Sequence, residues 1–155
     1  MKSILISLLL VGASALAAQA ETFTFTSVGT TQNAINAPVL GDKPVMAVFI
    51  ETKATITYAS GKAATNLGHC ASWSTTPGST FEIDGACVDT ESNGDQDSIV
   101  YGCDYADKER TKADCWGYLT GMSGGLAGKS GTISWHQSIS PDGKGAANGV
   151  GQWNN

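Results

Sequence analysis

The chain has 155 residues, of which 41% are hydrophobic and 15% are charged, and its net charge at pH 7 is −5. This length allows one domain to bury a core of its own. The acidic balance argues against nucleic acid and against an anionic membrane as the main partner, because both need a basic protein surface.

The first twenty residues have the pattern of a secretory signal peptide. Lys2 supplies a positive start, an apolar run follows from Ile4 to Val11, and the small residues Ala18 and Ala20 flank a cleavage point. We therefore expect a leader over residues 1–20 and a single domain over residues 21–155. The leader predicts a protein that is secreted or periplasmic.

Alternating apolar and polar residues predict β structure in the rest of the chain. Over residues 45–58 the even positions form an apolar face, from Met46 to Tyr58, while the opposite face carries Glu51 and Lys53. This period of two is typical of a half-buried antiparallel strand. We expect eight strands, at residues 22–28, 45–58, 69–75, 80–90, 98–105, 113–121, 130–139 and 145–153.

Turn sequences separate these strands at intervals typical of hairpins. They are ASGK (59–62), TPGS (76–79), SNGD (92–95) and SPDGK (140–144), and the segment from Thr31 to Asp42, with Pro38 and Gly41, is expected to be a connecting loop. The up-and-down order favours a closed antiparallel barrel over a sandwich, because closure removes exposed strand edges. Ten of the 19 glycines lie between Gly117 and Gly151, where they suit the bends of a small barrel.

The chain contains four cysteines, Cys70, Cys87, Cys103 and Cys115. In an oxidising compartment an even number predicts two disulfides, and three pairings are open. We favour Cys70–Cys87 with Cys103–Cys115, because each pair then brackets one turn. The wide spacing does not resemble a zinc site, and we expect no metal and no cofactor.

The segment SGGLAGKS (123–130) resembles a nucleotide-binding loop but lacks its first glycine, since Ser123 stands there. Such a loop also needs a helix after it, whereas TISWHQSIS, from Thr132, predicts a strand. We interpret the segment as a Gly-rich connection between strands.

The longer stretch DCWGYLTGMSGGLAGKSGTISW, residues 114–135, resembles the Gly-rich hairpin of the allene oxide cyclase-like and dirigent-like barrels. The resemblance implies an eight-stranded antiparallel barrel with a central cavity. Members of these families steer or cyclise a small hydrophobic molecule, or have no assigned activity. The matching residues are mostly glycines and small residues, so no catalytic set is carried over.

Few residues are candidates for acid–base chemistry. His136 shares a polar strand face with two serines, so it points outward if the face with Trp135 lines the interior, although the reverse assignment stays open. His69 is expected opposite the neighbouring disulfide. Glu82 and Asp84 share one strand face, as paired acid–base carboxylates can, but alternation favours their exposure to water.

The acidic segment DTESNGDQD, from Asp89 to Asp97, partly matches a calcium-binding loop. Val100 stands where a bidentate glutamate should bind, and strands rather than helices flank the segment. Asn93 and Gly94 instead predict a hairpin tip, whose acidic residues keep it soluble.

Aromatic residues suggest a pocket for a small hydrophobic or aromatic molecule, with Trp116, Tyr118 and Trp135 as the candidate lining. Core packing is the competing interpretation. The alternative function is a cofactor-independent isomerase or cyclase, with Tyr118, His136 or Glu51 as weak catalytic candidates. A third is surface interaction through the acidic region 89–114. Binding predicts a cavity without an ionisable group at its base, whereas an enzyme predicts a buried group there with a perturbed pKa.

Overall fold

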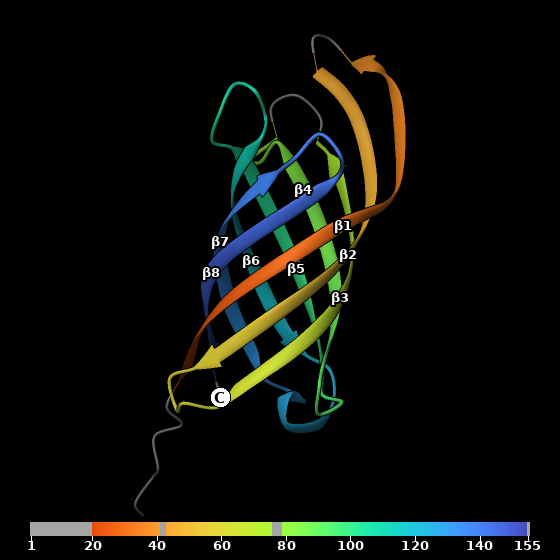
Figure 1. Ribbon diagram of the computed structural model, residues 1–155. Coiled ribbons are helices and arrows are strands. Elements are labelled where there is room, and N and C mark those ends of the chain that lie inside the picture. Colours follow the sequence, from red (N-terminus) through yellow and green to blue (C-terminus); the bar gives the residue numbers. More distant parts are fainter. Residues whose placement is uncertain (1–19, 41–42, 76–78, 155) are drawn as a thin grey trace, which may run out of the picture.

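A computed structural model describes residues 20–40, 43–75 and 79–154 of the protein. The described chain forms a closed antiparallel barrel in which each strand pairs with its sequence neighbours and β1 closes on β8 (Figure 1). The predicted eight-stranded barrel is therefore confirmed. The strands are β1 (Glu21–Leu40), β2 (Lys43–Tyr58), β3 (Ala63–Ser74), β4 (Ile83–Glu91), β5 (Gln96–Tyr105), β6 (Lys112–Gly121), β7 (Ser130–Ile139) and β8 (Lys144–Asn154).

One short 3₁₀ helix, η1 (Gly124–Leu126), joins β6 to β7. No helix within the described ranges is long and apolar enough to cross a membrane. Residues 1–19 of the expected leader lie outside the described residues, and so do residues 76–78 of the predicted TPGS turn.

The expected loop between Thr31 and Asp42 is wrong for most of its length, because β1 continues to Leu40. Pairing with β2 continues past a register shift between Thr31 and Asn33, so the irregular sequence is accommodated as a bulge rather than a loop. Pairing of β1 with β8 ends at Thr30, opposite Lys144. β1 and β2 consequently extend beyond the rest of the barrel as a two-stranded ribbon (Figure 1).

Both predicted disulfides are confirmed, Cys70–Cys87 between β3 and β4 and Cys103–Cys115 between β5 and β6. In each pair the two cysteines lie directly opposite in the strand register, with Cα atoms 4.0 and 4.1 Å apart. The cysteines are buried in the barrel interior with the other core residues. Each bond therefore fastens two neighbouring strands from the inside.

The two ends of the barrel differ. At the end where β1 begins, the interior is filled by the buried side chains of Phe23, Tyr58, Leu126 and Trp153. At the other end, the β7–β8 turn lies against β1, with the Thr31 N–H donating to the Gly143 carbonyl at 2.9 Å. The lining of the interior cavity reaches this second end, where it includes Ala34, Met46 and Pro141, and we call this end the mouth.

Candidate functional site

A cavity of about 420 Å³ occupies the barrel interior. This volume lies within the usual range for small-molecule sites. Its walls are mainly apolar, and the principal side chains are Phe25, Ile50, Ile56, Ile99, Tyr101 and Trp135. At the mouth the lining comes from the ribbon of β1 and β2 and from the β7–β8 turn. The cavity confirms the central hollow that the sequence resemblance implied.

Three acidic residues lie at the inner end of this cavity. Asp89 and Glu91 project from β4, and Asp97 projects from β5, with only 4 to 5% of each residue exposed. The strand register places Asp97 opposite Asp89, and Glu91 opposite Asn66 of β3. These residues, with Tyr58 of β2, form what we call the acidic base of the cavity.

Hydrogen bonding at the acidic base leaves acceptors unused. The Tyr58 hydroxyl donates to Glu91 Oε1 at 2.5 Å. Glu91 Oε2 and Asn66 Oδ1 are buried, and neither has a hydrogen-bond partner among the described residues. Unpartnered buried acceptors are uncommon in folded proteins and call for an explanation.

Burial changes the acidity of these groups. It raises the pKa of Asp97 to about 7, and the negative charges of Asp89 and Glu91 add to the effect. Burial likewise raises the pKa of Asp89 to about 6, although the charge of His69 acts in the opposite direction. The pKa of Tyr58 is also raised, mainly by burial and then by its hydrogen bond to Glu91. The acidic base can therefore exchange protons near neutral pH.

A glycine makes room for the acidic base. Gly68 of β3 pairs with Asp89 on one side and with Thr52 on the other. A Cβ atom at Gly68 would lie 2.1 Å from Asp89 Oδ1 and 2.4 Å from Thr52 Oγ1. Any side chain at this position would displace the carboxylate, so the glycine determines where Asp89 lies.

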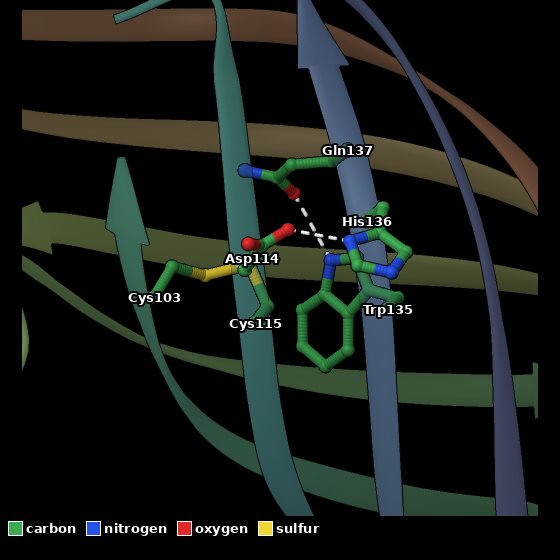
Figure 2. Close-up of polar contacts among 6 residues, drawn as sticks. All are labelled: Cys103, Asp114, Cys115, Trp135, His136 and Gln137. Carbon is green, nitrogen blue, oxygen red and sulfur yellow. Dashed lines mark hydrogen bonds and ion pairs between the residues drawn. A yellow bond between two sulfur atoms is a disulfide. The ribbon is translucent and has the colours of Figure 1, made fainter. Parts of the chain in front are cut away.

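Of the three aromatic residues expected to line a pocket, the structure places only Trp135 in the cavity. Its Nε1–H donates to Gln137 Oε1 at 3.1 Å (Figure 2). Its ring lies edge-on to Tyr101, with the ring centroids 5.2 Å apart. Trp116 and Tyr118 lie together on the outer face, 38% and 58% exposed, with ring centroids 4.3 Å apart. The expected grouping of all three around one cavity is therefore not found.

The candidate acid–base residues lie on the outer wall. His136 points away from the cavity, because the strand face with Trp135 lines the interior and the reverse assignment that the sequence left open is not found. Its Nδ1 lies 2.5 Å from Asp114 Oδ1 (Figure 2). Both of these side chains are well exposed. Glu51 and His69 face each other in the register of β2 and β3, and neither lines the barrel cavity. These side chains therefore lie on the opposite side of the barrel wall from the acidic base.

The expectation that the acidic hairpin residues serve solubility is wrong for Asp89, Glu91 and Asp97. The hairpin tip itself is confirmed, since Gly94 has a φ of +91° between β4 and β5. Asp89 and Glu91 point inward because they share a strand face with the buried Cys87, and Asp97 does so because it shares a face with the buried Ile99. That parity was readable in the sequence, and it could have identified the acidic base.

The other carboxylate hypotheses find little geometric support. No group of three or more His, Cys, Asp or Glu side chains within the described ranges is arranged to hold a metal ion. Glu82 and Asp84 lie outside the cavity lining, and Glu82 Oε2 accepts a hydrogen bond from the Tyr105 N–H at 3.2 Å.

Comparison with known proteins gives no family for this chain. No model of a known protein family matches its sequence, and no curated protein sequence matches it. The candidate site therefore rests on the geometry of the barrel interior.

Proposed function

We propose that the barrel takes up a small, mainly apolar molecule through its mouth. The observation that carries this proposal is the cavity of about 420 Å³ with walls of aromatic and aliphatic side chains. Such a concave apolar site with a few convergent polar groups is typical of small-molecule binding. The resemblance to the allene oxide cyclase-like and dirigent-like barrels is consistent with an apolar ligand.

We also propose that the protein acts outside the cytoplasm, in a periplasm or after secretion. The signal-peptide pattern at residues 1–20 supports export. The two disulfides agree with an oxidising compartment, where such bonds persist. Intact mass of the exported protein tests the start at Glu21.

Uptake is tested with the neutral fluorescent probe N-phenyl-1-naphthylamine, whose emission rises in apolar surroundings. Ala147 lines the cavity, and the adjacent Asn148 faces outward on the same strand. Ala147→Phe should fill the cavity and abolish the rise in emission, while Asn148→Phe should leave it intact. If Ala147→Phe does not fold, Ser27→Leu fills the same region from β1. Equal emission from filled and unfilled cavities would overturn the proposal.

A second candidate function is a cofactor-independent isomerase or cyclase. It is favoured by the buried carboxyls of the acidic base, because an ionisable group with a perturbed pKa at the base of the cavity was expected for an enzyme, whereas binding alone was expected to show a base without such a group. In this role Asp97 replaces Tyr118, His136 and Glu51 as the candidate acid. It would protonate the bound molecule at one atom, and its carboxylate would accept a proton from another.

Isomerisation leaves the mass of the bound molecule unchanged, which provides a test without a known substrate. Molecules that copurify with the exported wild-type protein and with Asp97→Asn are compared by mass and by chromatographic retention. An enzyme predicts equal masses with different retention times, because the variant retains unconverted substrate. Identical molecules in both preparations would favour binding alone.

A further inference from the structure

We propose that the molecule taken up by the cavity carries a protonated amine, which Glu91, Asp89 and Asp97 bind at the inner end. This inference rests on the proposed uptake and specifies the chemical class of the ligand. The ligand would have an apolar body, lying against Trp135 and the aliphatic walls, and a cationic group at the acidic base.

The first argument is an excess of hydrogen-bond acceptors. Glu91 is only 4% exposed, yet its Oε2 has no partner among the described residues, and Asn66 Oδ1 is in the same state beside it. The residues lie directly opposite in the register of β3 and β4. Both free atoms are acceptors, so the group that satisfies them must be a donor. A primary ammonium group offers three donors and no acceptor.

The second argument is the lack of a compensating positive charge inside the barrel. Among the described residues that line the cavity, the basic side chain is Lys144, which lies at the mouth and pairs with Asp142 at 2.8 Å. Lys62 is exposed at the other end, with its Nζ 5.1 Å from the centroid of the Tyr58 ring. Burying three acids without a cation nearby costs free energy, because their charges lose contact with water. A bound cation reduces this cost.

The third argument concerns the kind of cation. The acids do not form a group suited to a metal ion within the described part of the chain. One Glu91 oxygen is already occupied by the Tyr58 hydroxyl. The adjoining walls are mainly apolar and suit the hydrocarbon part of an amine, which a metal ion lacks. An organic ammonium ion fits these surroundings better than a metal ion.

Binding of such a cation should be coupled to protons. Asp97 and Asp89 have raised pKa values, of about 7 and about 6, so they are partly protonated near neutral pH in the empty cavity. The ammonium group favours their charged forms and so releases protons on binding. Glu91, Tyr58 and Tyr101 face the same region, and His69 acts on Asp89 from the outer wall of β3.

The test uses two probes with the same apolar body, 4-phenylbutan-1-amine and 4-phenylbutan-1-ol, in calorimetric titrations of the folded protein. At about pH 8, where both aspartates are largely ionised, the amine should bind at least about tenfold more tightly than the alcohol. This preference should decline at about pH 5, where the aspartates hold protons. Near pH 6.5 the binding enthalpy of the amine should depend on the buffer, because protons are released.

Two variants locate the effect, Glu91→Gln and Asp97→Asn, which remove charge with little change of shape. Each should reduce the preference for the amine by about tenfold and leave binding of the alcohol nearly unchanged. Glu109→Gln is the matched control, because Glu109 is an exposed glutamate outside the cavity. This variant changes the net charge of the protein by the same amount as the other two, and it should leave the preference for the amine over the alcohol unchanged.

Each outcome separates this inference from the proposed uptake. If the alcohol binds as tightly as the amine at the higher pH, the ammonium site is overturned and uptake of apolar molecules stands. The inference is also overturned if the amine does not bind, or if both variants keep the full preference. Failure of both probes and of N-phenyl-1-naphthylamine would overturn the proposed uptake as well.

Discussion

Asp97 lies directly opposite Asp89 across the β4–β5 pair, and 5% of each residue is exposed. Like charges at directly opposite positions of a sheet destabilise it, and burial adds the cost of desolvation. The barrel therefore holds an unfavourable arrangement at the inner end of an otherwise apolar cavity. Such an arrangement is typical of binding and catalytic sites, where polar groups are placed for a ligand rather than for stability.

The first prediction concerns the effect of pH on stability. The pKa of Asp97 rises from 3.8 to about 7 on folding. Between these values the folded state binds more protons than the unfolded state, so stability falls as the pH rises. A difference of about three pKa units corresponds to a loss on the order of 4 kcal/mol from Asp97 alone. Urea denaturation of the ligand-free protein at several pH values between 4 and 8 measures this loss.

Asp97→Asn should remove the part of this dependence that comes from Asp97, because the amide does not titrate, and should leave the smaller part from Asp89, whose pKa is raised to about 6. Asp104→Asn serves as the control, since Asp104 is exposed on the same strand. A pH dependence that is the same in wild type and Asp97→Asn would contradict the prediction.

The second prediction concerns the space beside Asp89. Gly68→Ala would bring a methyl group to 2.1 Å from Asp89 Oδ1, so the carboxylate must move. We expect a loss of about 1–3 kcal/mol in the free energy of unfolding, as for other overpacked interiors. Gly29→Ala is the matched control, because its nearest atom is Ile50 Cγ2 at 3.3 Å and a small shift of that side chain suffices. Equal losses in the free energy of unfolding for both variants would show that the position of the Asp89 carboxylate does not require a glycine at residue 68.

The third prediction concerns the order in which the disulfides are reduced. Cys70 and Cys87 line the cavity, whereas Cys103 is 0% exposed and does not line it. Reduction requires a thiolate to reach a sulfur atom, so access controls the rate. Dithiothreitol under native conditions should therefore reduce Cys70–Cys87 first, as measured by alkylation and peptide mass mapping. In concentrated urea the difference should disappear, and preferential native labelling of Cys103 and Cys115 would refute the prediction.

The fourth prediction compares two tryptophans. Trp135→Leu should weaken binding of N-phenyl-1-naphthylamine about tenfold, because the indole supplies a large part of the cavity wall. Trp116→Leu should leave the affinity unchanged, since Trp116 lies on the outer face with Tyr118. Titration of the two variants with the probe measures both effects. A larger loss of affinity for Trp116→Leu would indicate that the probe binds at the outer wall instead of in the cavity.

Local signals in the amino-acid sequence were sufficient to predict the architecture of this protein. Alternation along residues 45–58, turn sequences such as SNGD and the even number of cysteines are local signals, and they predicted the strands, the barrel and both disulfides. The same local signals missed the continuation of β1 to Leu40, because a bulge beside a long partner strand keeps an irregular segment paired. They also missed the first six residues of β3, which begins at Ala63 rather than at residue 69.

Strand parity in the sequence groups Asp89 with Cys87, but which strand face lies inside the barrel depends on its closure. Trp116 and Trp135 look alike in the sequence, but they lie on opposite faces of the barrel wall, one exposed and one in the cavity. Asp89 and Asp97 look like solvated hairpin residues, because carboxylates near a turn usually face water. Closure of the barrel instead places them in a shared interior, where register and burial determine their charge. Alternation gives the two faces of each strand, and closure decides which face becomes the inside.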